Sequence, residues 1–139
     1  MTMQSELLET SFQAVVLRGE AFVAAFYERL FTRFPETRAF FAATDMSAQR
    51  KKLQQSLGLI VEHLQHPEEL STPLKELGQR HVTYGIQPEH YPLVGMALLE
   101  TFADFLGDQW TEAHRDAWIA GYEAVSRLMV QGAQESPSR

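Results

Sequence analysis

The chain has 139 residues, of which 45% are hydrophobic, so it has the size and composition of one domain with a buried core. A formal net charge of −6 argues against a nucleic-acid groove or a polybasic membrane patch, because both need a positive surface. The absence of cysteine excludes disulfides, thiolate metal sites and a cysteine nucleophile.

The N-terminal stretch "MTMQSELLET" carries acids and no basic segment before an apolar run. Nowhere do about 18 apolar residues follow one another, as a membrane-spanning helix would need. We therefore expect a soluble, cytoplasmic protein with no membrane insertion and no nucleic-acid partner.

Apolar residues recur at intervals of three and four over residues 7–16 and 22–34, which predicts two amphipathic helices. Pro35 is suited to the first turn of a short third helix, because its fixed φ and missing N–H are tolerated there. After a brief loop at "AATDMS", a long helix is expected over residues 46–65. Its inward side chains are Leu53, Leu57, Ile60, Val61 and Leu64.

Thr72 before Pro73 is typical of an N-cap followed by proline at the first helical position, so the next helix is expected over residues 73–84. Gly85 and Pro88 then interrupt the chain.

Two long helices, residues 89–106 and 111–131, complete the pattern, and Thr111 is the expected N-cap of the second. The polar residues 132–139 are expected to form a frayed tail. The prediction is thus a single all-α domain over residues 1–139.

His81 lies on the apolar stripe of its predicted helix, because Leu74 and Leu77 precede it by seven and four residues. Its imidazole should point inward, either as a core histidine with a satisfied hydrogen bond or as a ligand. One imidazole suffices as the protein's bond to haem iron, because the porphyrin supplies four nitrogens. Zinc needs three or four protein ligands, and the other histidines share no metal spacing with His81.

Four stretches carry a resemblance to a known family: "FYERLFTRFPETRAFF", "SAQRKKLQQSLGLIVEHL", "LKELGQRHVTYGIQPEHYPLVG" and "DAWIAGYEAVSRLM". They resemble the bacterial single-domain haemoglobins and the globin domain of flavohaemoglobins, over residues 6–131. This resemblance implies a globin fold whose helices pack around a haem pocket, with one haem b in each chain.

By the same resemblance, His81 is the axial ligand of the iron, ten residues before Tyr91 in "HYPLVG". Phe41, the second residue of "FF", matches a phenylalanine that packs on the haem, a role compatible with ordinary core packing. The other lining residues implied are Leu53, Leu77, Ile86 and Val94.

On the opposite face of the haem, Tyr27 and Gln49 match the polar positions that hold the gas ligand. Taken alone, Tyr27 on an apolar helix face is typical of a core tyrosine. Gln49 alone is equally compatible with a surface glutamine at a helix start.

One position departs from the family. Flavohaemoglobins carry a glutamate in the last helix that joins the proximal histidine and the tyrosine in a hydrogen-bonded triad. An ungapped count reaches Ala133, and the nearest glutamate is Glu135. Without that carboxylate a reversible ligand carrier is favoured over a peroxidase-like enzyme, since hydrogen-bond acceptors behind a ligating imidazole tune the metal.

The resemblance implies high-affinity, reversible binding of dioxygen and conversion of nitric oxide to nitrate, with electrons from a separate reductase. Carbon monoxide is a further expected ligand, and the chain is expected to be a monomer or homodimer. Two other classes stay open: a haem-based sensor of gas or redox state, and a haem-free globin-like regulatory module.

Overall fold

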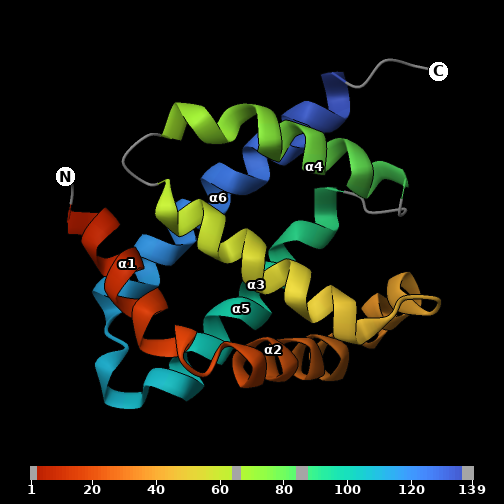
Figure 1. Ribbon diagram of the computed structural model, residues 1–139. Coiled ribbons are helices and arrows are strands. Elements are labelled where there is room, and N and C mark those ends of the chain that lie inside the picture. Colours follow the sequence, from red (N-terminus) through yellow and green to blue (C-terminus); the bar gives the residue numbers. More distant parts are fainter. Residues whose placement is uncertain (1–2, 64–66, 84–87, 136–139) are drawn as a thin grey trace.

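The computed structural model describes residues 3–63, 67–83 and 88–135, and every regular element within them is a helix (Figure 1). The all-α class predicted from periodicity is confirmed. In chain order the elements are α1 (Met3–Val16), α2 (Gly19–Arg33), η1 (Pro35–Phe41), α3 (Met46–Glu62), η2 (Pro67–Leu70), α4 (Ser71–Thr83), η3 (Pro88–His90), α5 (Tyr91–Leu106), η4 (Gly107–Gln109) and α6 (Glu112–Glu135), where η denotes a 3-10 helix. None of the described helices is both long and apolar enough to cross a membrane.

The main core forms where α2, α5 and α6 meet, because each contributes large aromatic rings to one cluster. Phe102 of α5 lies 4.7 Å from Phe22 and 4.4 Å from Trp118, measured between ring centroids. Each such side chain contributes roughly 1.5–3 kcal/mol when fully buried. Trp118 also donates a 2.7 Å hydrogen bond from Nε1 to Ser11 Oγ, so its polar atom is satisfied and α1 is tied to α6.

Several helix starts differ from the predicted ones: α1 begins at Met3, α2 at Gly19, α4 at Ser71 and α5 at Tyr91. α2 begins at Gly19, three residues before its first core phenylalanine, and follows α1 after a turn of two residues. α4 begins at Ser71 because the 3-10 turn Pro67–Leu70 runs directly into it. The prediction of Thr72 as N-cap is therefore wrong: Thr72 and Pro73 both lie in the first turn, where a missing N–H loses no intrahelical bond.

The predicted start of the last helix is confirmed, since the backbone N–H of His114 donates to Thr111 Oγ1 at 3.3 Å. α6 continues to Glu135, so residues 132–135 are helical rather than part of a frayed tail. Residues 136–139 lie outside the described part of the chain, as do Leu64, Gly85 and Ile86.

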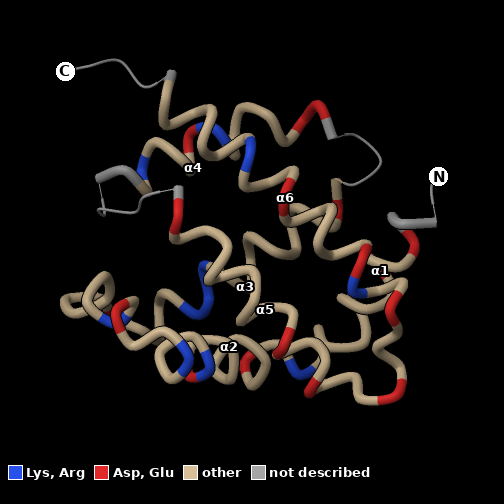
Figure 2. The backbone as a smooth tube through the Cα atoms, turned by 180° about the vertical axis from the view of Figure 1, so that it is seen from behind, with Lys and Arg blue, Asp and Glu red and all other residues tan. Residues whose placement is uncertain are grey.

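α4, the helix that carries His81, is attached to the rest of the fold from one side. It packs chiefly against α6 and, within the described residues, makes no extensive contact with α2, α3 or α5. Figure 1 and the reverse view in Figure 2 both show α4 at one end of the molecule, beside the C-terminal part of α6, and α2 at the other end. Leu70, Leu74 and Met129 form a second, smaller apolar cluster beneath α4.

Candidate functional site

Tyr27, Gln49 and Phe41 come from three different elements and meet in the structure. Tyr27 of α2 is buried, with 6% of its surface exposed. Gln49 in the first turn of α3 donates a hydrogen bond from Nε2 to Tyr27 Oη at 3.1 Å. The ring of Phe41, at the end of η1, stands edge-on to the Tyr27 ring with centroids 5.6 Å apart. We call these three residues the tyrosine cluster.

The position of Gln49 depends on where α3 begins. Asp45 caps this helix, because its carboxylate accepts a 3.0 Å hydrogen bond from the backbone N–H of Ser47. The backbone N–H of Gln49 donates to the Asp45 carbonyl oxygen at 3.0 Å, which closes the first turn. The cap thereby directs the glutamine side chain towards Tyr27.

The environment of Tyr27 keeps its hydroxyl protonated. Burial raises the pKa of Tyr27 above its ordinary value, and the hydrogen bond from Gln49 lowers this pKa by a smaller amount. At neutral pH the oxygen therefore accepts from Gln49 while its own O–H remains a donor.

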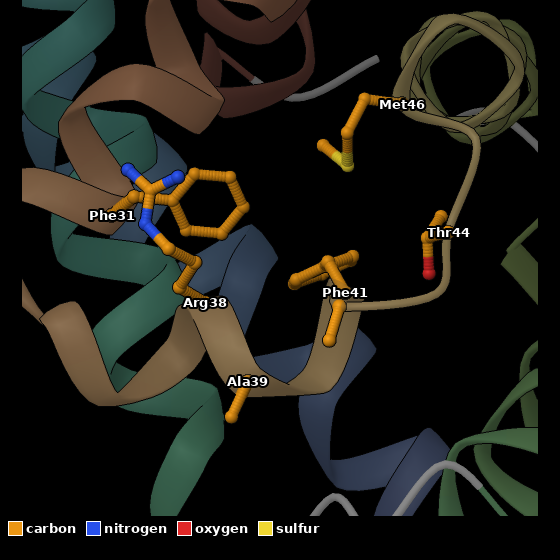
Figure 3. A pocket seen from close by; sticks show the side chains of 7 residues that line it. Phe31, Arg38, Ala39, Phe41, Thr44 and Met46 are labelled. Atoms are coloured by element: carbon orange, nitrogen blue, oxygen red, sulfur yellow. The ribbon is translucent and has the colours of Figure 1, made fainter.

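A hollow of about 580 Å³ lies beside the tyrosine cluster, at the corner between η1 and α3. Figure 3 shows Phe31, Phe41 and Met46 around it, with Arg38 beside Phe31. The Tyr27 ring contacts both phenylalanines, with centroids 6.1 Å from Phe31 and 5.6 Å from Phe41. Sequence reasoning missed Phe31, although its place four residues after Tyr27 puts it on the same helix face.

His81 lies half-buried near the end of α4, and its Nδ1 is 2.8 Å from the carbonyl oxygen of Leu77. Burial lowers the pKa of His81, the bond to Leu77 opposes that shift, and the nearby Arg80 charge adds to it. The neutral imidazole with its proton on Nδ1 carries a lone pair on Nε2, which is the form that binds a metal. No group of three or more His, Asp or Glu side chains in the described ranges is placed to hold a metal ion.

The lowered pKa of His81 predicts that acid destabilises the ligand-free protein. In the unfolded chain histidine titrates near pH 6.5, so below about that pH the unfolded state binds more protons than the folded state. The free energy of unfolding should therefore fall as the pH drops from about 6.5 to the folded pKa. Urea unfolding between about pH 5 and 8 checks this slope, which should be smaller in His81→Gln; equal slopes would contradict the assignment.

The ring of Tyr91 lies beside that of His81. The two rings are nearly parallel, at 25°, with centroids 6.3 Å apart. Tyr122 of α6 donates a 2.6 Å hydrogen bond from its hydroxyl to the backbone oxygen of Tyr91. Gly95 admits the Tyr122 ring, because a Cβ at this position would lie 2.8 Å from a ring carbon. Tyr122 and Gly95 thus hold the start of α5 beside His81, a contact that sequence reasoning missed because the partners are 31 residues apart.

Replacement of Tyr122 by phenylalanine should lower the free energy of unfolding by about 1 kcal/mol, because the Tyr91 carbonyl loses its partner. The matched control is Tyr91→Phe, which keeps the backbone oxygen that accepts the bond. Chemical denaturation of the two variants measures the difference. Equal losses would show that the hydrogen bond does not contribute.

The apolar residues expected to line a haem share an intermediate degree of burial. Phe41, Leu53, Leu77, Tyr91 and Val94 are each half-buried, although large apolar side chains inside a fold are usually covered completely. Phe41, Leu53 and Val94 border the main core, whereas Leu77 and Tyr91 border the cluster beneath α4. The main core and the cluster beneath α4 thus each leave apolar side chains partly uncovered, which fits a flat apolar group bound between them. Ile86 lies outside the described residues.

The structure bears on only one of the two residues considered for the family's glutamate. Ala133 is half-buried in the last turns of α6, where a methyl group offers no hydrogen-bond acceptor. The side chain of Glu135 lies outside the described part of the structure. A carboxylate beside His81 therefore stays an expectation of the resemblance.

Known proteins are similar to this chain over most of its length. A family model described as Globin matches residues 24–129. A flavohemoprotein of Deinococcus radiodurans is 32% identical over 129 residues, covering 91% of this chain and 32% of that protein. A flavohemoprotein of Rhodopirellula baltica is 37% identical over 118 residues, covering 84% of this chain and 29% of that protein. This chain spans about a third of the length of these relatives.

Solved structures match the whole fold. An engineered carbene transferase, derived from a proposed nitric oxide dioxygenase of Rhodothermus marinus, superposes with a TM-score of 0.85 at 27% identity, covering 97% of this chain and 94% of that chain. A bacterial globin from Campylobacter jejuni superposes with a TM-score of 0.84 at 23% identity, covering 97% of each chain. The predicted globin fold is confirmed.

Proposed function

This chain belongs to the globin family, and on that premise we propose that it binds dioxygen reversibly and with high affinity at a haem. Haem binding is implied by the family and by the flavohemoprotein relatives. The finer proposal is one haem b per chain, with His81 as the single protein bond to its iron. When bound, the haem supplies a ferrous iron that takes up a diatomic gas reversibly.

The state of His81 supports its role as the iron ligand. The Leu77 carbonyl fixes the proton on Nδ1, so the Nε2 lone pair has a defined direction. Burial favours the neutral imidazole, so protons compete weakly with the metal at pH 7. The half-buried apolar side chains on both flanks would supply most of the binding energy for a porphyrin.

The observation that carries the proposal of high oxygen affinity is the hydrogen bond from Gln49 to Tyr27. A donor to the tyrosine oxygen polarises its O–H and orients it, which makes the hydroxyl a stronger donor to a ligand in a dry pocket. With a haem in place, this hydroxyl would donate a hydrogen bond to a polarised ligand such as dioxygen, and carbon monoxide, as the poorer acceptor, would gain less. Tyr27 would therefore slow the release of dioxygen, with Gln49 acting through it.

Conversion of nitric oxide is the second part of the proposal. It rests on the flavohemoprotein relatives and on the similarity to a proposed nitric oxide dioxygenase. Nitric oxide, dioxygen and one electron together give nitrate, so each turnover needs an electron from a separate reductase. A slowly released dioxygen suits this reaction, because it stays in the pocket until nitric oxide arrives.

Rapid mixing tests this function. The reduced, haem-loaded protein is equilibrated with dioxygen and mixed with nitric oxide, with and without a chemical reductant. We expect one nitrate per haem without the reductant and repeated turnover with it, together with slow oxygen release in the absence of nitric oxide. Oxygen release as fast as nitric oxide capture, with no nitrate formed, would contradict the proposal.

A further inference from the structure

Two glycines lie where α4 crosses α6, and each faces the backbone of the other helix. A Cβ at Gly78 of α4 would collide with the backbone of Met129 in α6. A Cβ at Gly132 of α6 would collide with the backbone of Lys75 in α4. The contacts are reciprocal: on each helix, the glycine lies three residues after the residue whose backbone the other glycine faces. We call this arrangement the glycine crossing.

The glycine crossing has no tolerance for a side chain. Backbone atoms cannot rotate away as the end of a flexible side chain can, so any Cβ would force the two helices apart. Gly58 and Gly121 differ in this respect, because the nearest atoms to a Cβ there are 3.9 Å away on Phe12 and 3.5 Å away on Leu8. Glycine is also the least favourable helix residue after proline, so two of them at one contact need a packing reason.

The crossing lies next to the histidine. Gly78 is three residues before His81 and directly follows Leu77, whose carbonyl oxygen contacts His81 Nδ1 at 2.8 Å. In the described part of the chain α4 packs chiefly on α6, as Figure 1 shows, so this contact determines how far α4 stands from the other helices. A change in the separation of α4 and α6 therefore moves the imidazole.

We propose that the glycine crossing of Gly78 and Gly132 is a positioning device that sets the place of His81 relative to the haem. This inference rests on the proposed function, because it assumes that His81 binds the iron. The crossing makes the distance between α4 and α6 as short as backbone contact allows. It would thereby fix where His81 Nε2 stands for a haem iron, through backbone atoms that no rotamer change can move.

The test compares Gly78→Ala with Gly121→Ala in the haem-loaded protein. Both substitutions replace a helical glycine by the same residue, but only the first collides with a backbone. We expect the iron–histidine stretching frequency of the ferrous protein, measured by resonance Raman, to shift in Gly78→Ala and to stay unchanged in Gly121→Ala. Haem should leave Gly78→Ala about tenfold faster, a difference of about 1.4 kcal/mol.

Gly132→Ala provides an independent test from the other helix. It should shift the same frequency, because it separates the same pair of helices. The double variant Gly78→Ala/Gly132→Ala should change the haem dissociation rate by much less than the product of the two single changes, because helices already apart leave room for the second methyl group. In the haem-free protein, amide exchange in α4 should accelerate in both single variants and not in Gly121→Ala.

Different results would refute haem binding and the positioning of His81 by the glycine crossing. A wild-type chain that takes up no haem would refute the proposed function itself. The wild-type chain could instead show an iron–histidine band that is unchanged in Gly78→Ala and Gly132→Ala. This result would refute positioning even if both variants melt at a lower temperature, and the crossing would then be a purely structural contact. Failure of both variants to fold would likewise show a requirement of the fold and overturn the proposal.

Discussion

His81→Ala should abolish stable haem binding, which is the largest effect that we expect from one substitution. The variant loses the only proposed protein bond to the iron while the apolar pocket stays intact. We expect haem affinity to fall by at least about a hundredfold, which corresponds to about 2.7 kcal/mol. Absorption titration with haem measures it, and a normal Soret band in the purified variant would refute the ligand assignment.

His63→Ala is the matched control. The Nδ1 of His63 lies 2.9 Å from the carbonyl oxygen of Leu59, four residues earlier, which repeats the local pattern of His81 on a different helix. Its replacement should leave the haem spectrum unchanged. In His81→Gly, added imidazole should restore the ferrous spectrum, because a free ligand can occupy the vacated space; no recovery at saturating imidazole would show that the loss came from misfolding.

Tyr27→Phe should raise the rate of oxygen dissociation by at least tenfold. A hydrogen bond to a charged or strongly polarised acceptor contributes about 1.5–3 kcal/mol, and each 1.4 kcal/mol is about a factor of ten. The phenylalanine keeps the ring contacts with Phe31 and Phe41, so the change isolates the hydroxyl. Stopped-flow displacement of dioxygen measures the rate.

A second variant and a second gas help to interpret the Tyr27→Phe result. Gln49→Ala should give a smaller increase, because the tyrosine hydroxyl remains and loses only the donor that polarises it. The dissociation rate of carbon monoxide should change much less than that of dioxygen, because carbon monoxide is the poorer acceptor. Equal changes for both gases would indicate a steric effect, and an unchanged oxygen rate would remove Tyr27 from the ligand site.

The helices could be predicted from the sequence because each buries one stripe that recurs at three and four. Leu57, for example, is buried as its place in the pattern of α3 predicts. Helix starts were less predictable, since they depend on the backbone conformation of the segment that precedes each helix. At Ser71 a 3-10 turn runs straight into α4, and the capping preference of Thr72 is overridden.

The resemblance predicted the residues of the tyrosine cluster but not the contacts among them. It named Tyr27, Gln49 and Phe41 as residues of one pocket, and the structure brings all three together. It did not indicate that Gln49 donates to the tyrosine oxygen, because that depends on the side-chain directions of two helices. This contact changes the expected role of Gln49 from a parallel donor to a group acting through Tyr27.

The arrangement behind His81 could not be predicted from the sequence. Gly78 and Gly132 are 54 positions apart, and a glycine inside a helix does not by itself show which other helix it contacts. Only the packing of α4 on α6 shows that each faces a backbone. Tyr122 is similar, because the space for its ring is provided by Gly95 on another helix.

The central claim is that this globin holds one haem on which dioxygen binds reversibly. Titration of the haem-free protein with haem, followed by absorption spectra of the reduced form before and after dioxygen is added and removed, tests it most directly. The account predicts saturation at one haem per chain and a spectrum that changes with dioxygen and returns when the gas is removed. Absence of saturable haem binding, or a reduced spectrum indifferent to dioxygen, would contradict it.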